Sequence, residues 1–443
     1  MNDFTQVLPE NAPGLNTIDE PRLRMAVVGA GPAGLALALE AARLLPDVDV
    51  TVFDARPADR DVSGDPRTLA LSQGSVQSLQ RMGVWQAIEA GAQVAPILEV
   101  HVSQLQPTVL WPGQGQPEVS ISAREQGVPQ LGAVLSYGTL VAPMQRAYEA
   151  LVRARPAHCC LRFATPVRGF KPLAQGVELD ADIADAFDLA VVAEGGVFAD
   201  QPALQWPQGL SRDYQQTAWV GQVRLSEPPE GLLDGVAYER FTPSGPAALL
   251  PLPRGAVSPG GQLGRRASLV WCVQRGDDPV LALDDAQRLA LLNTLFPTRA
   301  GQILELSALK AFPLGLNAHQ RLVDQGVVAR IGNAAQTLHP VAGQGLNLGL
   351  RDAHELIESL RGMGPVPAEP QARAQKVRQA LARFERRRQP DRIALIAGTD
   401  FLARSFTWTP PVLATLRGLA LGVLQKVSPA KQALAQMMMF GHR

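Results

Sequence analysis

The sequence contains little cysteine. Three cysteines occur in 443 residues, and two of them, Cys159 and Cys160, are adjacent. An odd number without regular spacing does not fit a disulfide framework and is typical of reduced thiols in a cytoplasmic protein. None of the three has metal-ligand spacing with a histidine. The sequence therefore predicts neither disulfides nor a metal site.

Long apolar runs and an excess of one charge are also absent. No run of 18 or more apolar residues is free of charges, so no transmembrane helix is predicted. Residues 1–20 are polar and do not fit a signal peptide, and we interpret residues 1–22 as a flexible leader. Lysine and arginine number 41, as do aspartate and glutamate, which argues against nucleic acid as a partner. We expect a cytoplasmic protein, with peripheral contact to the inner membrane as an open alternative.

What is present is a large apolar content and two glycine-rich loops. Hydrophobic residues make up 46% and charged residues 19%, enough for a sizeable core. The length predicts two or more subdomains. The positions of these glycines indicate what the two loops bind.

The first glycine loop follows the apolar run Met25–Val28 and reads Gly29-Ala-Gly-Pro-Ala-Gly34. An alanine- and leucine-rich helix and the strand Val48–Phe53 come next, and this strand ends at Asp54. In this pattern the first glycine permits a tight turn, the second lets the backbone approach a pyrophosphate, and the third lets helix and strand pack closely. An acidic residue at the end of the second strand binds a ribose hydroxyl. The motif predicts dinucleotide binding.

A second loop follows the apolar run Val327–Ile331. It reads Gly332-Asn-Ala-Ala-Gln-Thr-Leu-His-Pro-Val-Ala-Gly-Gln-Gly-Leu-Asn-Leu-Gly349. We expect a strand, a polar turn, a glycine loop around Gly343 and Gly345, and a helix through Leu356. The start of such a helix presents free N–H groups and the positive end of the helix dipole. It can therefore hold a negative group or stabilise one that forms during a reaction.

Two further polar residues lie where the predicted sheet would place them near the nucleotide. Arg67 follows the nucleotide-binding unit, and its guanidinium could reach a pyrophosphate, although a surface arginine is the alternative. The apolar run Phe187–Ala193 leads into Glu194-Gly195-Gly196. An acidic residue followed by glycines after a buried strand suggests the carboxyl edge of a doubly wound sheet.

Shifts in residue pattern divide the chain into segments. Strand-like runs with Pro/Gly turns between residues 201 and 309 predict an antiparallel block. A basic run, Arg386–Arg388, before Pro390 suggests a solvated helix end, and Val412–Met439 suggests a docking helix pair more than a membrane anchor. We predict a flexible leader (1–22), three parts of a dinucleotide-binding domain (23–95, 138–200 and 310–365), loops and short strands toward the next domain (96–137), an antiparallel domain (201–309) and C-terminal helices (366–443).

Three stretches together resemble one protein family. They are the second glycine loop, Asp65-Pro-Arg-Thr-Leu-Ala-Leu71, and Tyr238-Glu-Arg-Phe-Thr-Pro-Ser-Gly-Pro-Ala-Ala-Leu-Leu-Pro251. The chain resembles the single-component FAD-dependent aromatic hydroxylases with the p-hydroxybenzoate hydroxylase fold, and within them the ubiquinone-biosynthesis branch. The resemblance extends from about Arg24 to the C-terminal helices.

The resemblance implies a fold and a reaction. The fold is of the α/β class: a Rossmann-like FAD-binding domain with an inserted antiparallel β-sheet substrate domain and C-terminal helices. The cofactor is FAD, with NADPH or NADH as a transient reductant. The reaction uses molecular oxygen and a flavin hydroperoxide to hydroxylate a polyprenylated phenol. Because the cofactor supplies the chemistry, no catalytic triad or metal cluster is needed.

The resemblance also implies site residues, position by position. The cofactor-binding residues it implies are Gly29, Gly31, Pro32, Ala33, Gly34, Asp54, Arg67, Gly332, Asn333, Gly345, Leu346 and Asn347. The residues implied beside the flavin ring and the substrate are Pro340, Gly343, Gln344 and Gly345. Two positions depart from the usual family pattern, because Glu194 and Asn333 each stand where aspartate is common.

Several interpretations remain open from the sequence. His339 is either a base or, as we favour, a structural histidine before Pro340. An apolar wall formed by Leu249, Leu250 and Leu252 is expected to contact the substrate. Alternative functions are hydroxylation of another, soluble aromatic compound and a non-catalytic role in a quinone-synthesis assembly. Such a complex and a membrane surface are the candidate partners.

Overall fold

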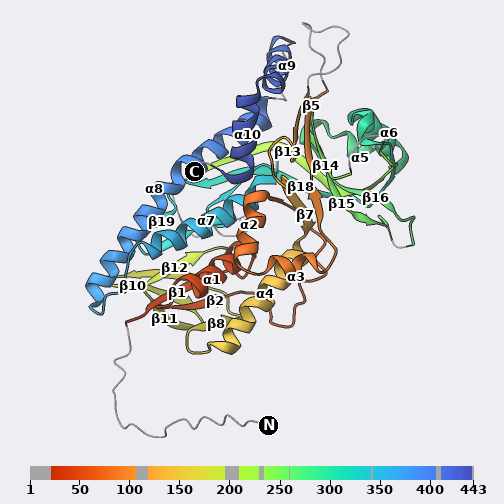
Figure 1. The fold of residues 1–443 in the computed structure, drawn as a ribbon. Coiled ribbons are helices and arrows are strands. Elements are labelled where there is room, and N and C mark those ends of the chain that lie inside the picture. Colours follow the sequence, from red (N-terminus) through yellow and green to blue (C-terminus); the bar gives the residue numbers. More distant parts are fainter. Residues whose placement is uncertain are drawn as a thin grey trace, which may run out of the picture.

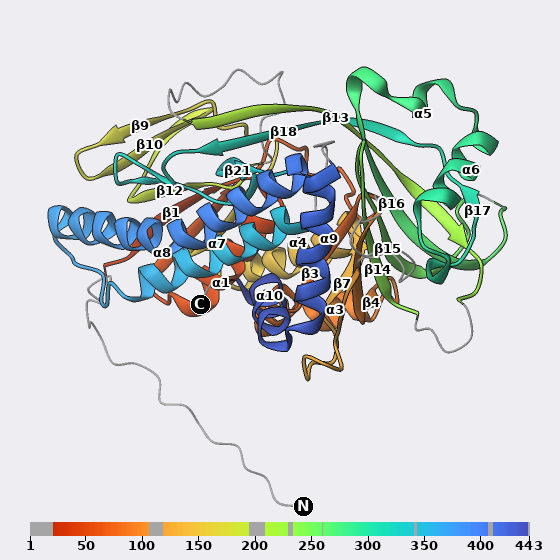
Figure 2. The same cartoon turned by 90° about the horizontal axis from the view of Figure 1, so that it is seen from above.

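The computed structural model describes residues 21–105, 118–194, 209–228, 234–258, 260–340, 343–405 and 411–441. These residues form an α/β layer around a mostly parallel sheet, and a large antiparallel sheet lies beside it (Figure 1). The C-terminal helices contact both layers, as the view from above shows (Figure 2). The predicted fold class is confirmed.

The parallel sheet consists of short apolar strands that are buried on both faces. Every residue of β1 except Arg24 is buried, and so is all of β12, as expected for a sheet covered on two sides. In the described residues its order is β19-β20-β12-β1-β2-β8, and only the β19–β20 pair is antiparallel. The strands are β1 Leu23–Val28, β2 Val48–Phe53, β8 Cys159–Arg162, β12 Leu189–Val192, β19 Val323–Asp324 and β20 Val328–Arg330.

Three helices cover this sheet on the side of α1. The helix α1 (Pro32–Leu44) begins with a proline, whose fixed φ suits the first helical turn. It is buried along most of its length because α7 (Gln344–Arg361) and α4 (Tyr137–Ala154) pack against it. The two predicted glycine loops are thereby brought side by side, at the starts of α1 and α7.

The antiparallel sheet has two apolar faces with different partners. On one face Leu249, Leu269 and Trp271 pack with α6, and on the other Val119 and Ile121 pack with α10. The order is β21-β18-β13-β16-β15-β14-β5-β6, with β17 paired to β13. The strands are β5 Glu99–Gln104, β6 Glu118–Ser122, β13 Gly209–Leu225, β14 Val236–Thr242, β15 Gly245–Gly255, β16 Gly264–Gln274, β17 Ile303–Leu306, β18 Lys310–His319 and β21 Gln336–Thr337.

Smaller elements connect the two layers. Two three-stranded sheets have the orders β11-β10-β9 and β3-β7-β4 within the described residues. Their strands are β3 Thr68–Ser72, β4 Ala95–Ile97, β7 Gly132–Ser136, β9 Gly169–Leu173, β10 Gly176–Ala181 and β11 Ile183–Phe187. The helices are α2 Gln73–Arg81, α3 Trp85–Glu89, α5 Pro279–Ala282 and α6 Asp285–Leu295, with 3₁₀ turns η1 Arg275–Asp277, η2 Thr298–Ala300 and η3 Gly332–Ala334.

The C-terminal helices are α8 (Pro370–Ser405), α9 (Pro411–Lys426) and α10 (Ser428–Phe440). The predicted break at Pro390 is wrong, because α8 continues through it. The predicted solvated end is wrong for Arg388, which is buried and paired with Asp352 and Asp391. Tertiary contacts on both sides of Pro390 outweigh its local preference. Among the described residues, no helix is long and apolar enough to span a bilayer.

Candidate active site

The first glycine loop has the geometry of a phosphate-binding turn. A Cβ at Gly34 would overlap the carbonyl oxygen of Gly29, so only glycine lets α1 start this close to β1. A Cβ at Gly31 would instead meet a single neighbour, the hydroxyl of Tyr137 at 3.8 Å, so that side of the backbone is open within the described residues. Pro32 and Ala33 form the first turn of α1. The helix N-terminus thus offers N–H groups to an anion.

Asp54 lies at the end of β2, as predicted, and already has protein partners. Its Oδ2 accepts from the backbone N–H of Ala30 at 2.7 Å, and its Oδ1 accepts from the N–H and the Nε of Arg56 at 2.8 and 3.0 Å. The carboxylate therefore fixes the glycine loop against β2. Arg56 was not predicted, and its position two residues after Asp54 is the only sequence signal for it.

Arg67 lies close to the same loop. Its guanidinium stacks 4.1 Å from the centre of the Tyr137 ring, and that tyrosine's hydroxyl is the group facing Gly31. The Arg67 side chain is 64% exposed and forms a two-point pair with Asp65, which raises the pKa of Arg67. A cation that is exposed, oriented and beside a helix N-terminus is well placed for a pyrophosphate.

The second glycine loop turns sharply into α7. Gly343 has φ 59°, a left-handed conformation that favours glycine, and its N–H donates to the carbonyl of the exposed Pro340 at 3.0 Å. The Asn333 side chain lies next to Gly345, with its Oδ1 3.8 Å from where a Cβ would be. Leu346 packs partly against the α/β core. The structure thus brings Asn333 and the α7 N-terminus together.

Asn347 holds this loop to the β3–α2 junction. Its Oδ1 accepts from the N–H of Ser72 and the hydroxyl of Ser75, both at 2.7 Å. Its Nδ2 donates to the carbonyls of Ala70 and Gly343, both at 3.0 Å. All four bonds are within the protein, so the side chain positions the loop and leaves the first-turn N–H groups to face a ligand.

A buried ion cluster supports the loop from behind. Asp352 accepts from the N–H of Gly332 at 3.1 Å and from the Nε of Arg388 at 2.7 Å. Arg351 joins the cluster through Asp391 and also donates to the side chain of Gln344 at 3.4 Å. Sequence reasoning missed this cluster, since Arg388 lies in a basic run that suggested solvent.

His339 has the environment of a structural histidine. It is buried, its Nε2 lies 2.9 Å from Oε1 of Gln216 on β13, and its ring packs edge-on against Tyr214. Burial lowers its pKa to about 4, so the ring is neutral near pH 7. It links the second loop to the antiparallel sheet, which favours the structural interpretation over a catalytic base.

Glu194 lies at the carboxyl end of β12, next to the first glycine loop. Its backbone nitrogen is 2.9 Å from where a Cβ of Gly29 would be. Burial raises its pKa, and the nearby Asp54 carboxylate adds to that shift. The predicted glycines 195 and 196 lie outside the described residues. The edge position is as predicted, while a role for Glu194 in nicotinamide-dependent reduction remains a prediction.

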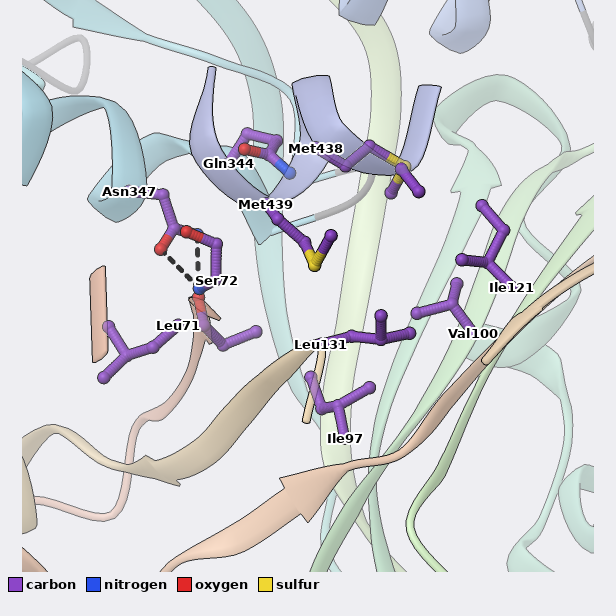
Figure 3. Close-up of a pocket in the computed structure, with 12 residues that line it drawn as sticks. Leu71, Ser72, Ile97, Val100, Ile121, Leu131, Gln344, Asn347, Met438 and Met439 are labelled. Carbon is purple, nitrogen blue, oxygen red and sulfur yellow. Dashed lines mark hydrogen bonds between the residues drawn. The ribbon is translucent and has the colours of Figure 1, made fainter. Parts of the chain in front are cut away.

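An apolar pocket opens beside the end of the second glycine loop, where the chain turns at Gly343 into α7 (Figure 3). We call this segment the α7 loop. Its polar end consists of Ser72, Gln344 and Asn347. The rest of its lining is apolar and comes from β3, the β4–β5 and β6–β7 regions and α10: Ala70, Leu71, Ile97, Val100, Ile121, Leu131, Ala435, Met438 and Met439.

The predicted leucine wall is only partly correct. Leu250 and Leu252 pack in the same cluster as the pocket residue Ile121. Leu249 packs on the opposite face of the sheet with Trp271 and Phe296. Leu249 and Leu250 are neighbours in β15 and point to opposite faces of the sheet, so the three leucines do not form one wall of this pocket.

The fold and this site define a dinucleotide-binding oxidoreductase. A family model described as an FAD binding domain matches residues 22–180. Within the described residues, no group of three His, Cys, Asp or Glu side chains could hold a metal ion. Residues 22–180 therefore resemble an FAD-binding domain, and the chain is similar to FAD-dependent monooxygenases.

Relatives of known name cover nearly the whole chain. The chain is 29% identical over 432 residues to the 3-demethoxyubiquinol 3-hydroxylase of Escherichia coli, covering 92% of this chain and 96% of that one. It is 29% identical to the ubiquinone hydroxylase UbiL of Rhodospirillum rubrum, covering 92% of this chain and 87% of that one. The p-nitrophenol 4-monooxygenase PnpA of Pseudomonas putida has the same fold, with a TM-score of 0.67 at 15% identity over 96% of this chain and all of that one.

Proposed function

We propose that this protein is a FAD-dependent, NAD(P)H-using monooxygenase that hydroxylates a polyprenylated phenol in ubiquinone biosynthesis. The substrate class that we favour is a 2-polyprenyl-6-methoxyphenol. The observation that carries the proposal is the pocket whose polar end lies at the α7 loop and whose remaining walls are apolar. The names of nearly full-length relatives point to the same pathway.

The residues present fit FAD. The open backbone at Gly31, the oriented Arg67 and the N-terminus of α7 supply donors and positive charge along one surface of the α/β layer. Asp54 and Asn347 fix the two loops that carry these donors. When bound, FAD would accept electrons from NAD(P)H and supply the oxygen-transfer chemistry.

The protein itself positions the cofactor and the substrate, supplies positive charge beside the loop, and surrounds the pocket with apolar side chains. The N-terminus of α7 presents N–H groups and a positive dipole end, which stabilise negative charge beside the loop. The apolar side chains of Ile97, Ile121 and Met439 offer water no hydrogen-bond partner beside the polar end of the pocket. We further propose that so apolar a substrate is collected from a membrane surface or from a complex that shields it.

The test is mass-spectrometric profiling of quinone intermediates in cells that lack this protein. We expect a polyprenylated methoxyphenol to accumulate and ubiquinone to fall. Accumulation of a different prenylated phenol would assign the protein to another hydroxylation of the pathway. A normal quinone profile would contradict the proposal and favour a soluble aromatic substrate. In vitro, the purified protein with FAD and NAD(P)H should add one oxygen atom to the prenylated phenol.

A further inference from the structure

The helix α10 is held firmly over the pocket at both of its ends. At its start, the buried Lys431 donates to the carbonyl of Ser120 at 3.1 Å and pairs with Glu125 at 2.9 Å. At its end, the backbone of Met439 approaches Gly74 of α2 so closely that a Cβ there would lie 2.7 Å from the Met439 carbonyl oxygen. The helix is therefore a fixed part of the site's wall.

The end of α10 also contacts the residues behind the second glycine loop. A Cβ at Gly441 would overlap the guanidinium of Arg351. That same guanidinium donates to the side chain of Gln344 at the polar end of the pocket. The helix, the loop and the pocket are thus connected through one arginine, which fixes the distance between them.

The inner face of α10 is apolar where it meets the pocket. Ala435, Met438 and Met439 line the pocket from this helix, and Figure 3 shows Met439 pointing toward its centre. Val100 and Ile121 line it from the antiparallel sheet, and Ile97 lines it from β4. By contrast, the other face of α10 carries the exposed residues Gln432, Ala433 and Gln436.

Size and polarity indicate what this part of the pocket would hold. The pocket has about 80 Å³ of free volume, which is room for about six waters at ~10–15 Å³ each. That space suits one ring or one branched five-carbon unit. Its polarity falls from Gln344 and Asn347 toward Met438 and Ile121, so a ligand with a polar head and an apolar tail fits in one orientation only.

We propose that the inner face of α10, with β5 and β6, is the binding site for the first isoprenoid unit of the substrate's tail, an inference that rests on the proposed function. The phenol head lies toward the α7 loop and the tail leaves past Met438 and Met439. Methionine is unbranched and has three rotatable bonds, so these side chains can move aside for a branched hydrocarbon chain. Ala435 keeps the path free because its side chain is small.

The first test fills the path at Ala435. In Ala435→Phe, the ratio of kcat/KM for a methoxyphenol with two isoprene units to that for the tail-free methoxyphenol should fall at least tenfold. The matched control is Ala433→Phe, an exposed alanine two residues earlier in the same helix, and its ratio should equal that of wild type. An unchanged ratio in a folded Ala435→Phe variant overturns the tail site while leaving the hydroxylase assignment in place.

The second test needs no turnover and no variant. A methoxyphenol with a photoreactive diazirine in its second isoprene unit is irradiated with the full-length protein and FAD, and the modified peptides are mapped by mass spectrometry. Modification of residues 428–441, suppressed by excess unlabelled prenylated phenol, supports the site. Modification elsewhere overturns it. If neither phenol is hydroxylated, the proposed function fails, and the cross-linking result still decides whether α10 binds an isoprenoid tail.

Discussion

Replacing Arg388 with methionine should strongly destabilise the α/β layer. Its guanidinium is 6% exposed and pairs at 2.7 Å with both Asp352 and Asp391, which are 0% and 6% exposed. Removing one partner of a buried ion pair leaves an uncompensated charge and costs about 3–5 kcal/mol. That corresponds to a factor of roughly 100 to 4,000 in the unfolding equilibrium. The same Asp352 also accepts from Gly332, so the second glycine loop should loosen with it.

The assay is urea denaturation in the presence of saturating FAD, monitored by circular dichroism. The unfolding free energies of wild type and variant are compared with the same dependence on urea concentration. The control is Arg361→Met, which removes an exposed partner of Glu358 in α7 and should cost less than about 1 kcal/mol. The double variant Arg388→Met/Asp352→Asn should recover part of the loss, because asparagine still offers an oxygen to Gly332. An Arg388→Met variant within about 0.5 kcal/mol of wild type would refute the reasoning, since that is the usual range for neutral surface changes.

Three further outcomes are expected. Arg67→Ala should weaken FAD binding about 10- to 100-fold, because a charge-assisted hydrogen bond contributes about that much. The control Arg60→Ala, at an exposed arginine, should leave FAD binding unchanged. If fluorescence titration gives the same FAD affinity for Arg67→Ala and wild type, Arg67 is not part of the site. Burial lowers the pKa of His339 to about 4 from 6.5, so the unfolded chain binds the extra proton in that window and stability falls on acidification from pH 6.5 to 4. In His339→Gln, the loss of unfolding free energy between pH 6.5 and pH 4 should be smaller by up to about 3 kcal/mol, as measured by denaturation at both pH values. If the variant and wild type lose the same stability, the histidine is not buried as described. Gly349→Ala should cost about 1–3 kcal/mol because its Cβ would lie 2.9 Å from the Cα of Gly332. The control is Gly398→Ala, which has open space around it in the described residues and should stabilise α8 by up to about 1 kcal/mol. If Gly349→Ala and Gly398→Ala shift the melting temperature in the same direction, the reasoning is refuted.

Local pattern was sufficient where the structure depends on neighbours in sequence. The strand Val48–Phe53 was predicted with its observed bounds, because a short apolar run between turn residues admits few other conformations. The two glycine loops were placed correctly for the same reason. The strand-like runs predicted between residues 201 and 309 are also present, as β13 to β17.

Contacts between distant residues could not be predicted in this way. Nothing near Arg388 in sequence indicates that Asp352, 36 residues earlier, lies beside it. Likewise, β5 pairs in parallel with β14 although the segment around it suggested only loops and short strands. Such pairings depend on tertiary packing, which outweighs local propensity.

The bond between Ser72 and Asn347 has a consequence for how the protein is made. It joins residues 275 positions apart, and Asp352 then depends on Arg388 further along the chain. At ~5–20 residues per second, translation takes roughly 14 to 55 s to travel between Ser72 and Asn347. During that interval β1, α1 and β2 have been synthesised, but α7, which packs against α1, has not. The cofactor site can therefore mature only after Asn347 and Arg388 have been synthesised, and until then the nascent N-terminal region lacks the contacts that α7 supplies.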